Sequence, residues 1–177
     1  MRRLAALAGA VVLAALVWPE LTRYSAERRL GEVTNAFRAL LDRASDPETG
    51  RNLIAVGEAA LSVTDSLPGD PRPWIIGASS FLVTSQPQPA LEAYREAFAT
   101  GERAEIDLNL GRVYAMLNRR DNAERAFVRA GWVSPEIIAS IPDSAREKAH
   151  AEIQRLTDEL YGGRLTEPPP LPSDERR

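Results

Sequence analysis

Apolar side chains recur at steps of three and four residues along most of the chain, which is the spacing of one face of an α-helix. Pro19 lacks a backbone N–H, so we expect it to end or kink the helix that begins the chain. After it, the pattern predicts a helix over 20–44, whose apolar positions are Leu30, Val33, Phe37, Leu40 and Leu41. After a turn at 45–50, a second apolar stripe predicts a helix over 51–66.

From Pro71 onward, short helical patterns alternate with short turns. Asp70 and Asp143 are expected to cap the helices that follow them, and the glycines at 162–163 to end the last one. No segment alternates apolar and polar residues as a strand does, so the sequence predicts an all-α fold. The expected helices cover 72–85, 88–99, 103–117, 120–131, 135–141 and 143–161.

Residues 71–135 repeat with a period of 33. Helices of about a dozen residues cannot bury a face alone, so each needs a stacked neighbour. Small residues let two helix backbones approach, and an aromatic ring fills the space that remains. The repeat aligns small residues with small ones and rings with rings: Ala78 with Gly111, Phe81 with Tyr114, Ala90 with Ala123, Tyr94 with Phe127 and Ala97 with Ala130.

This pattern resembles the tetratricopeptide repeat family. "LG-x-x-Y" at 110–114, "A-x-x-x-F" at 123–127, Ala130 and Pro135 have the family's spacing, and Gly77–Ala78 stand where Leu–Gly is usual. The resemblance implies a short α-solenoid of two repeats over 71–135, with a concave face that binds peptides. A generic helical bundle with coincidental spacing is the alternative.

Around these repeats, the sequence divides into four further segments. Residues 22–68 form a degenerate helical pair, and 136–161 form C-terminal capping helices. The tail at 162–177 is rich in proline and lacks apolar periodicity, so we expect it to be disordered or extended and solvated. Its "PPPLP" stretch docking on an aromatic groove is the alternative.

The start of the chain, 1–21, is expected to be an N-terminal transmembrane helix. Two arginines precede an uncharged run, Leu4–Trp18, which is short for a span but long for a cleavable signal. Trp18 suits a membrane–water interface, and no small-x-small cleavage site follows. Alternatives are a cleaved signal and a soluble helix buried by a partner. Arg2 and Arg3 favour a cytoplasmic N-terminus, which would place the repeat domain in the periplasm, anchored to the inner membrane. The arginines that follow the run weaken the argument for this orientation.

Helical geometry places one set of side chains on the inner face of the repeats. This face is unusually apolar, and an exposed apolar patch marks an interaction site. Arg112 and Arg119 at its edge are expected to pair with acidic groups of a partner. The chain's own helix over 22–44 or 143–160 folding over this face is the alternative. The predicted partner-binding residues are Ile75, Ser79, Leu82, Val83, Leu108, Asn109, Arg112, Met116 and Arg119.

Composition excludes several functions. Cysteine is absent, which excludes thiolate metal ligands, and His150 is the single histidine, so a zinc site would have to be built almost entirely from carboxylates. Basic residues number 22, all arginine except Lys148, a bias that indicates a GC-rich bacterial genome. They are interleaved with 25 acids, and the net charge of -3 argues against nucleic-acid binding. No phosphate loop, HExxH or nucleophile elbow occurs, so we expect no enzyme, no cofactor, no metal and no small-molecule substrate.

These observations predict a membrane-anchored adaptor or scaffold of a bacterial envelope assembly, secretion or polysaccharide-export system. Its partner is expected to be a protein or peptide held by the repeats. A permanent small structural subunit of a membrane complex is the alternative, because the alanine-rich run at 4–18 permits close helix packing.

Overall fold

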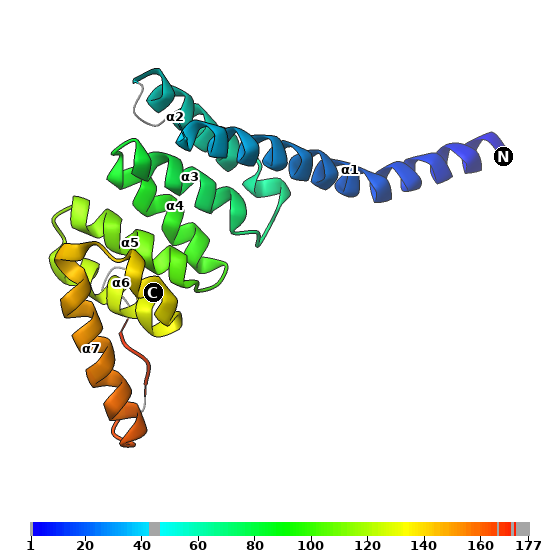
Figure 1. The fold of residues 1–177 in the computed structure, drawn as a ribbon. Helices are drawn as coiled ribbons and strands as arrows, with labels where there is room; N and C mark the ends of the chain where they lie inside the picture. The colour runs from blue at the N-terminus through cyan, green and yellow to red at the C-terminus, as the bar shows by residue number, and fades with distance from the viewer. Residues whose placement is uncertain (1, 43–46, 166, 171, 173–177) are drawn as a thin grey trace.

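The computed structural model describes residues 2–42, 47–165, 167–170 and 172, and side chains from Ala15 onward within these ranges except Pro47. These residues form helices packed against their neighbours in chain order, with no strand among them, which confirms the all-α class (Figure 1). The elements are α1 (Arg2–Leu41), α2 (Pro47–Leu61), η1 (Thr64–Ser66), α3 (Arg72–Val83), α4 (Pro87–Ala99), α5 (Ala104–Met116), α6 (Arg120–Val133), η2 (Pro135–Ser140) and α7 (Asp143–Tyr161).

The helices from α3 to α7 match their expected ranges to within two residues, whereas the region before them differs. The expected turn at 45–50 is wrong in its second half, because α2 begins at Pro47; residues 45–46 lie outside the described part. Proline is tolerated in a first helical turn, where its missing N–H would have no partner. Helix α2 also ends earlier than expected, at Leu61, and a short 3₁₀ turn follows it.

Helix α1 is continuous through Pro19, so of the two expected outcomes, an end or a kink, the end is wrong. The carbonyl of Pro19 accepts a hydrogen bond from Thr22 Oγ1 at 2.7 Å, and the helix beyond it is held by buried Ala26, Leu30 and Val33. Tertiary packing of an amphipathic face outweighs the loss of one backbone bond. Figure 1 shows the N-terminal half of α1 extending away from the other helices after a change of direction.

The structure reveals no helix, over the residues it describes, that is long and apolar enough to cross a membrane. The transmembrane helix expected at 1–21 is therefore not confirmed and stays a prediction.

Helices α3–α4 and α5–α6 form two hairpins whose turns repeat at 33 residues. Ser85 and Asn118 both take a left-handed backbone, with φ of 58° and 59°. The amide after each bonds a carbonyl five residues back: Gln86 to Phe81 at 2.8 Å and Arg119 to Tyr114 at 2.9 Å. This is the six-to-one bond of a Schellman motif, which ends a helix with a sharp reversal.

The small and aromatic residues of the repeat do meet in the core. A Cβ built on Gly111 would lie 2.4 Å from the Phe127 ring, so only glycine fits there without a shift. Ala78 and Tyr94 at the equivalent positions are fully buried. The predicted reason for the alternation, close helix approach with a ring filling the gap, is confirmed.

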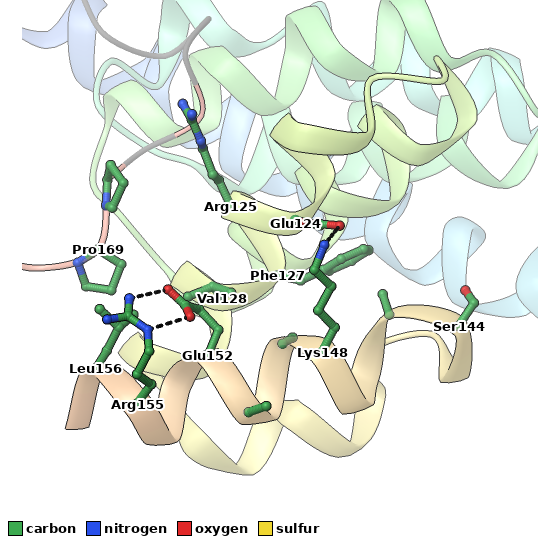
Figure 2. A pocket seen from close by; sticks show the side chains of 14 residues that line it. Glu124, Arg125, Phe127, Val128, Ser144, Lys148, Glu152, Arg155, Leu156 and Pro169 are labelled. Carbon is green, nitrogen blue, oxygen red and sulfur yellow. Dashed lines mark hydrogen bonds and ion pairs between the residues drawn. The ribbon is translucent and has the colours of Figure 1, made fainter. Parts of the chain in front are cut away.

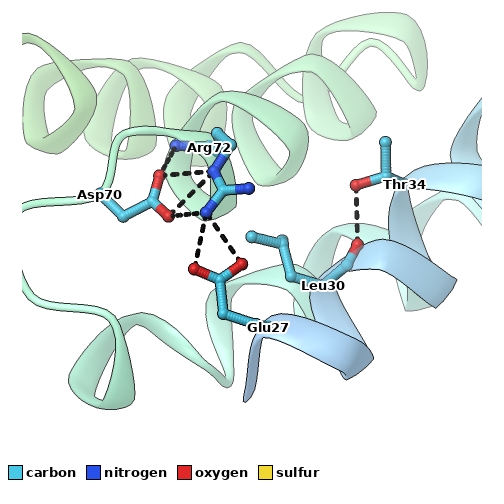
Figure 3. Close-up of polar contacts among 5 residues, drawn as sticks. All are labelled: Glu27, Leu30, Thr34, Asp70 and Arg72. Atoms are coloured by element: carbon cyan, nitrogen blue, oxygen red, sulfur yellow. Dashed lines mark hydrogen bonds and ion pairs between the residues drawn. The ribbon is translucent and has the colours of Figure 1, made fainter. Parts of the chain in front are cut away.

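A smaller apolar cluster joins α1 to the repeats. It contains Leu30 from α1, Ala60 from α2 and Ile76 from α3. Beside it, Arg72 bridges two acids: its Nε donates to Asp70 Oδ2 at 2.9 Å and its Nη2 to Glu27 Oε1 at 2.9 Å (Figure 3). Asp70 Oδ1 also accepts the backbone N–H of Arg72, which confirms its expected capping role.

The C-terminal region closes the stack. Helix α7 packs on α6 through buried Ala149, Ile153 and Leu156. Asp143 is the first residue of this helix rather than its cap, since no side-chain cap bond forms there and Pro142 precedes it. The chain reverses at Gly163, whose φ of +67° favours glycine, as expected.

The proline-rich tail folds back along α6 and α7, as Figure 1 shows in orange and red. Its described residues are extended, as expected, but the expectation of a solvated tail is wrong for Pro169 and Pro172, which are buried. Arg129 of α6 donates a hydrogen bond from Nη1 to the carbonyl oxygen of Pro169 at 2.7 Å. Proline rings carry apolar surface with no N–H to satisfy, so they pack on a helix face without polar cost.

Candidate functional site

The predicted inner face lies on α3 and α5, the first helices of the two hairpins. These two helices contact each other although α4 separates them in sequence. The 33-residue repeat pairs their positions: Ile75 with Leu108, Ser79 with Arg112 and Val83 with Met116. The structure therefore brings the predicted residues of α3 and α5 onto adjacent helices, as a surface that we call the α3–α5 face.

The α5 half of this face is partly covered by the chain itself. Leu108 is 5% exposed, so its expected role as an exposed groove residue is wrong. We attribute this burial to η2, which packs on α5 and whose Ile137 and Ile138 lie against the core cluster that contains Leu108. Arg112 fixes this contact, because its Nη2 donates to the carbonyl oxygen of Ser140 at 2.9 Å.

Polar groups form the floor of the α3–α5 face. Arg112 Nη1 donates to Asn109 Oδ1 at 3.0 Å, and the hydroxyls of Ser79 and Tyr94 share a hydrogen bond of 2.9 Å. Burial raises the pKa of Tyr94 to about 12, while the Ser79 hydrogen bond and the nearby charge of Arg112 oppose this rise. Asn109 and Arg112 are therefore oriented by their own neighbours, and the phenol stays neutral.

The apolar residues at one end of the face remain open. Val83 and Met116 are 45% and 44% exposed, whereas Ile75 and Leu82 are half-buried against the main core. Arg119 lies exposed at the start of α6, just beyond Met116. Two large apolar side chains at equivalent positions of touching helices give this end of the face the character of an interaction surface.

The sequence offered two of the chain's own helices, over 22–44 and 143–160, as covers of this face, and neither is packed on this exposed end. Helix α1 contacts the other end of α3, through the Glu27–Arg72 ion pair and Ile76. Helix α7 packs on α6. The segment after the hairpins that packs on α5 is η2, and Arg112 holds it through the carbonyl oxygen of Ser140.

A second apolar hollow, which sequence reasoning missed, lies between α6, α7 and the tail (Figure 2). It has a volume of about 750 Å³, and we call it the α6–α7 groove. Its floor includes Phe127, Val128, Ala149 and Leu156, and the tail lines it with Pro169 and Pro170. The signal in the sequence was the "PPPLP" stretch, whose docking on a groove was the less favoured alternative.

An ionic cluster formed by α6, α5 and the turn before α5 stands behind this groove. Arg129 donates hydrogen bonds from Nη2 to Glu102 Oε2 at 2.7 Å and from Nε to Glu102 Oε1. Asp107, which is fully buried, lies nearby. Hydrogen bonding by Arg129 lowers the pKa of Glu102, although burial acts in the opposite direction. The hydrogen bond to Glu102 in turn raises the pKa of Arg129, although burial lowers it. The negative charges of Glu102 and Asp107 add to the rise. The cluster fixes the guanidinium that holds the tail.

Comparison of the chain with family models, curated proteins and solved structures gives no match in any of the three. The proposals below therefore depend on the geometry of the molecule and on the residue pattern.

Proposed function

We propose that this protein is a non-enzymatic adaptor of the bacterial envelope, whose tetratricopeptide-like repeats bind a polypeptide partner on the α3–α5 face. The observation that carries the proposal is the pair Val83 and Met116, exposed to the same extent at equivalent positions of two adjacent helices. Such a pair offers a partner two apolar contacts, with the polar groups of Ser79, Asn109 and Arg112 beside them for orientation. The 33-residue repeat and its paired turns support the tetratricopeptide-like assignment.

We further propose that α1 anchors the repeats at the inner membrane, with the repeat domain in the periplasm. The uncharged run over 4–18 supports this, as do Trp18, Leu21 and Tyr24, whose side chains are exposed on α1. Figure 1 shows the N-terminal part of α1 projecting from the other helices. Tryptophan and tyrosine suit the membrane–water interface. A C-terminal alkaline-phosphatase fusion tests the orientation: an active fusion supports a periplasmic body, and an inactive one places it in the cytoplasm.

The binding face is tested by crosslinking in native membranes with the variant Val83→Glu/Met116→Glu. Leu108 is unsuitable for this purpose because it is buried, so a charge there would disturb the fold. Both substituted positions are nearly half-exposed, so we expect helicity and melting temperature to be unchanged while recovery of the crosslinked partner falls about tenfold or more.

The matched control is Leu160→Glu, at a position 47% exposed on α7. It adds one of the two charges at a similar exposure on a helix that packs on α6, so we expect full partner recovery. Unchanged recovery in the double variant, or an equal loss in the control, would contradict this face as the binding surface.

A permanent subunit of a membrane complex is the second candidate, and one observation favours it. Val17, Leu21 and Tyr24 are exposed and share one stripe of α1. Val17 and Ala26 are nine residues apart, which at about 100° per residue puts this stripe opposite the one that packs on the body. A subunit bound there would co-purify in fixed ratio in mild detergent, whereas the partner of an adaptor would be lost on dilution.

A further inference from the structure

We infer that the α6–α7 groove is a second binding surface, specific for an extended, proline-rich peptide, and that the chain's own tail occupies part of it as a competitor. The occupant already in place shows the chemistry that the groove accepts. Pro169 and Pro170 line the groove, and Pro169 is buried. This surface shares no residue with the α3–α5 face, so the inference goes beyond the proposed adaptor function.

The groove recognises backbone as well as rings. A polyproline II strand makes no internal hydrogen bonds, so its carbonyl groups remain available to a donor. Arg129 supplies that donor at 2.7 Å from the Pro169 oxygen, and its guanidinium is held in place by Glu102. A donor fixed in advance binds a carbonyl with little further loss of side-chain freedom. The site thus has the two elements that proline-rich recognition needs, an apolar floor and an oriented donor.

The tail fills one end of the groove and leaves the other open. In Figure 2, Pro169 lies beside Leu156 and Arg155, while Ser144 and Lys148 lie at the opposite end. Among the described tail residues, Pro169 and Pro170 are the ones that line the hollow, whose volume is about 750 Å³. A longer peptide has room to continue past Val128 toward Ala145, so it would make contacts that the tail does not.

The tail is connected in a way that permits exchange. It follows α7 through exposed Gly162 and Gly163, the second in a left-handed conformation, and the Arg164 amide bonds the Glu159 carbonyl at 2.8 Å. A segment tethered by so short a link acts at a high effective concentration and suppresses binding of a free peptide. Weakening the tail should therefore raise the affinity for a peptide added in solution.

The experiment uses the full chain and a fluorescent peptide with the sequence of residues 167–172, measured by anisotropy. In the variant Pro169→Ser/Pro170→Ser, the tail loses two groove-lining rings and its fixed backbone angles. We expect this chain to bind the peptide about tenfold more tightly than the wild-type chain, because the competing state is less populated. A peptide with glycine at each proline is the ligand control and should bind at least tenfold more weakly to the same variant.

The groove itself is tested in the tail-weakened chain. Ala145 is half-buried and lines the open end, so Ala145→Arg fills it and should lower peptide affinity about tenfold. Ala139→Arg, at an exposed position of η2 outside the lining, is the matched control and should have no effect. Amide NMR shifts confined to α6 and α7 on peptide addition would give support independent of these substitutions. Equal affinity in wild-type and tail-weakened chains, binding of the glycine peptide, or shifts elsewhere would overturn the inference.

Discussion

The two hairpins α3–α4 and α5–α6 share one backbone design but differ in what covers them. Their turns coincide at a spacing of 33 residues, down to the left-handed residues Ser85 and Asn118. At the end of the face nearest these turns, Val83 and Met116 are equally exposed. At the other end, Leu108 of the second hairpin is buried where η2 packs on α5, whereas Ile75 of the first is half-buried. A repeated sequence therefore sets the hairpin, while the segment outside the repeat decides which part of its face stays open.

The largest expected effect concerns the aromatic ring that both hairpins use. Phe127→Ala and Tyr94→Ala each remove a buried ring at equivalent positions. We expect either change to lower the free energy of unfolding by about 3–5 kcal/mol, through lost burial and the cavity left behind. Urea unfolding followed by circular dichroism measures this. A loss below about 1 kcal/mol at one position would show that the two rings are not equivalent.

A smaller effect distinguishes the hairpins at the residue beneath the ring. Gly111→Ala places a methyl group 2.4 Å from Phe127, so we expect a loss of about 1–3 kcal/mol from overpacking. Ala78→Gly, at the equivalent position, should cost about 1–2 kcal/mol, through added backbone freedom and the loss of a fully buried methyl group. In a Phe127→Leu background, the cost of Gly111→Ala should shrink, because the atoms it meets are gone. An equal cost in both backgrounds would mean that the ring is not what excludes the methyl group.

Alkaline pH is expected to destabilise the first hairpin. The pKa of Tyr94 is about 12 in the folded chain, while an unfolded tyrosine titrates near 10. Between these values the unfolded state loses its proton first, so the free energy of unfolding falls as pH rises, by about 2 kcal/mol in all. Tyr94→Phe should reduce this fall when unfolding is measured at several pH values from 9 to 12. An identical pH profile in the variant would assign the effect to other groups.

The repeats were predictable from the sequence because their determinants are local. Small and aromatic residues at a spacing of 33 specify which helix positions meet, and the left-handed residues of the two turns, Ser85 and Asn118, follow the same spacing. The fate of Pro19 was not predictable in this way. Whether a helix continues through proline depends on the packing of later residues such as Leu30 and Val33 against α2 and α3, which is a tertiary property.

The candidate surfaces were predictable only in part for the same reason. Helical periodicity placed Val83 and Met116 on one face, and both are exposed. It could not reveal that η2 would cover Leu108, since a 3₁₀ segment carries no periodic signal of where it docks. Nor could it locate the α6–α7 groove, whose walls come from two helices and a tail that lacks any apolar pattern. Contacts between non-periodic segments and helices are set by the folded surface.

The smallest expected effect tests why η2 stays on α5. Arg112→Ala removes the hydrogen bonds to Ser140 and Asn109, and we expect a loss of about 1 kcal/mol, because such bonds exchange with water. The local consequence should be clearer: hydrogen exchange of η2 amides should quicken about fivefold, while exchange in α3 and α4 stays unchanged. Ser79→Ala, at the equivalent position of the first hairpin, removes the bond to Tyr94 and should leave η2 exchange as it was. Faster exchange of η2 in both variants would mean that the two hairpins are coupled, and that the cover of the second is not held by Arg112 alone.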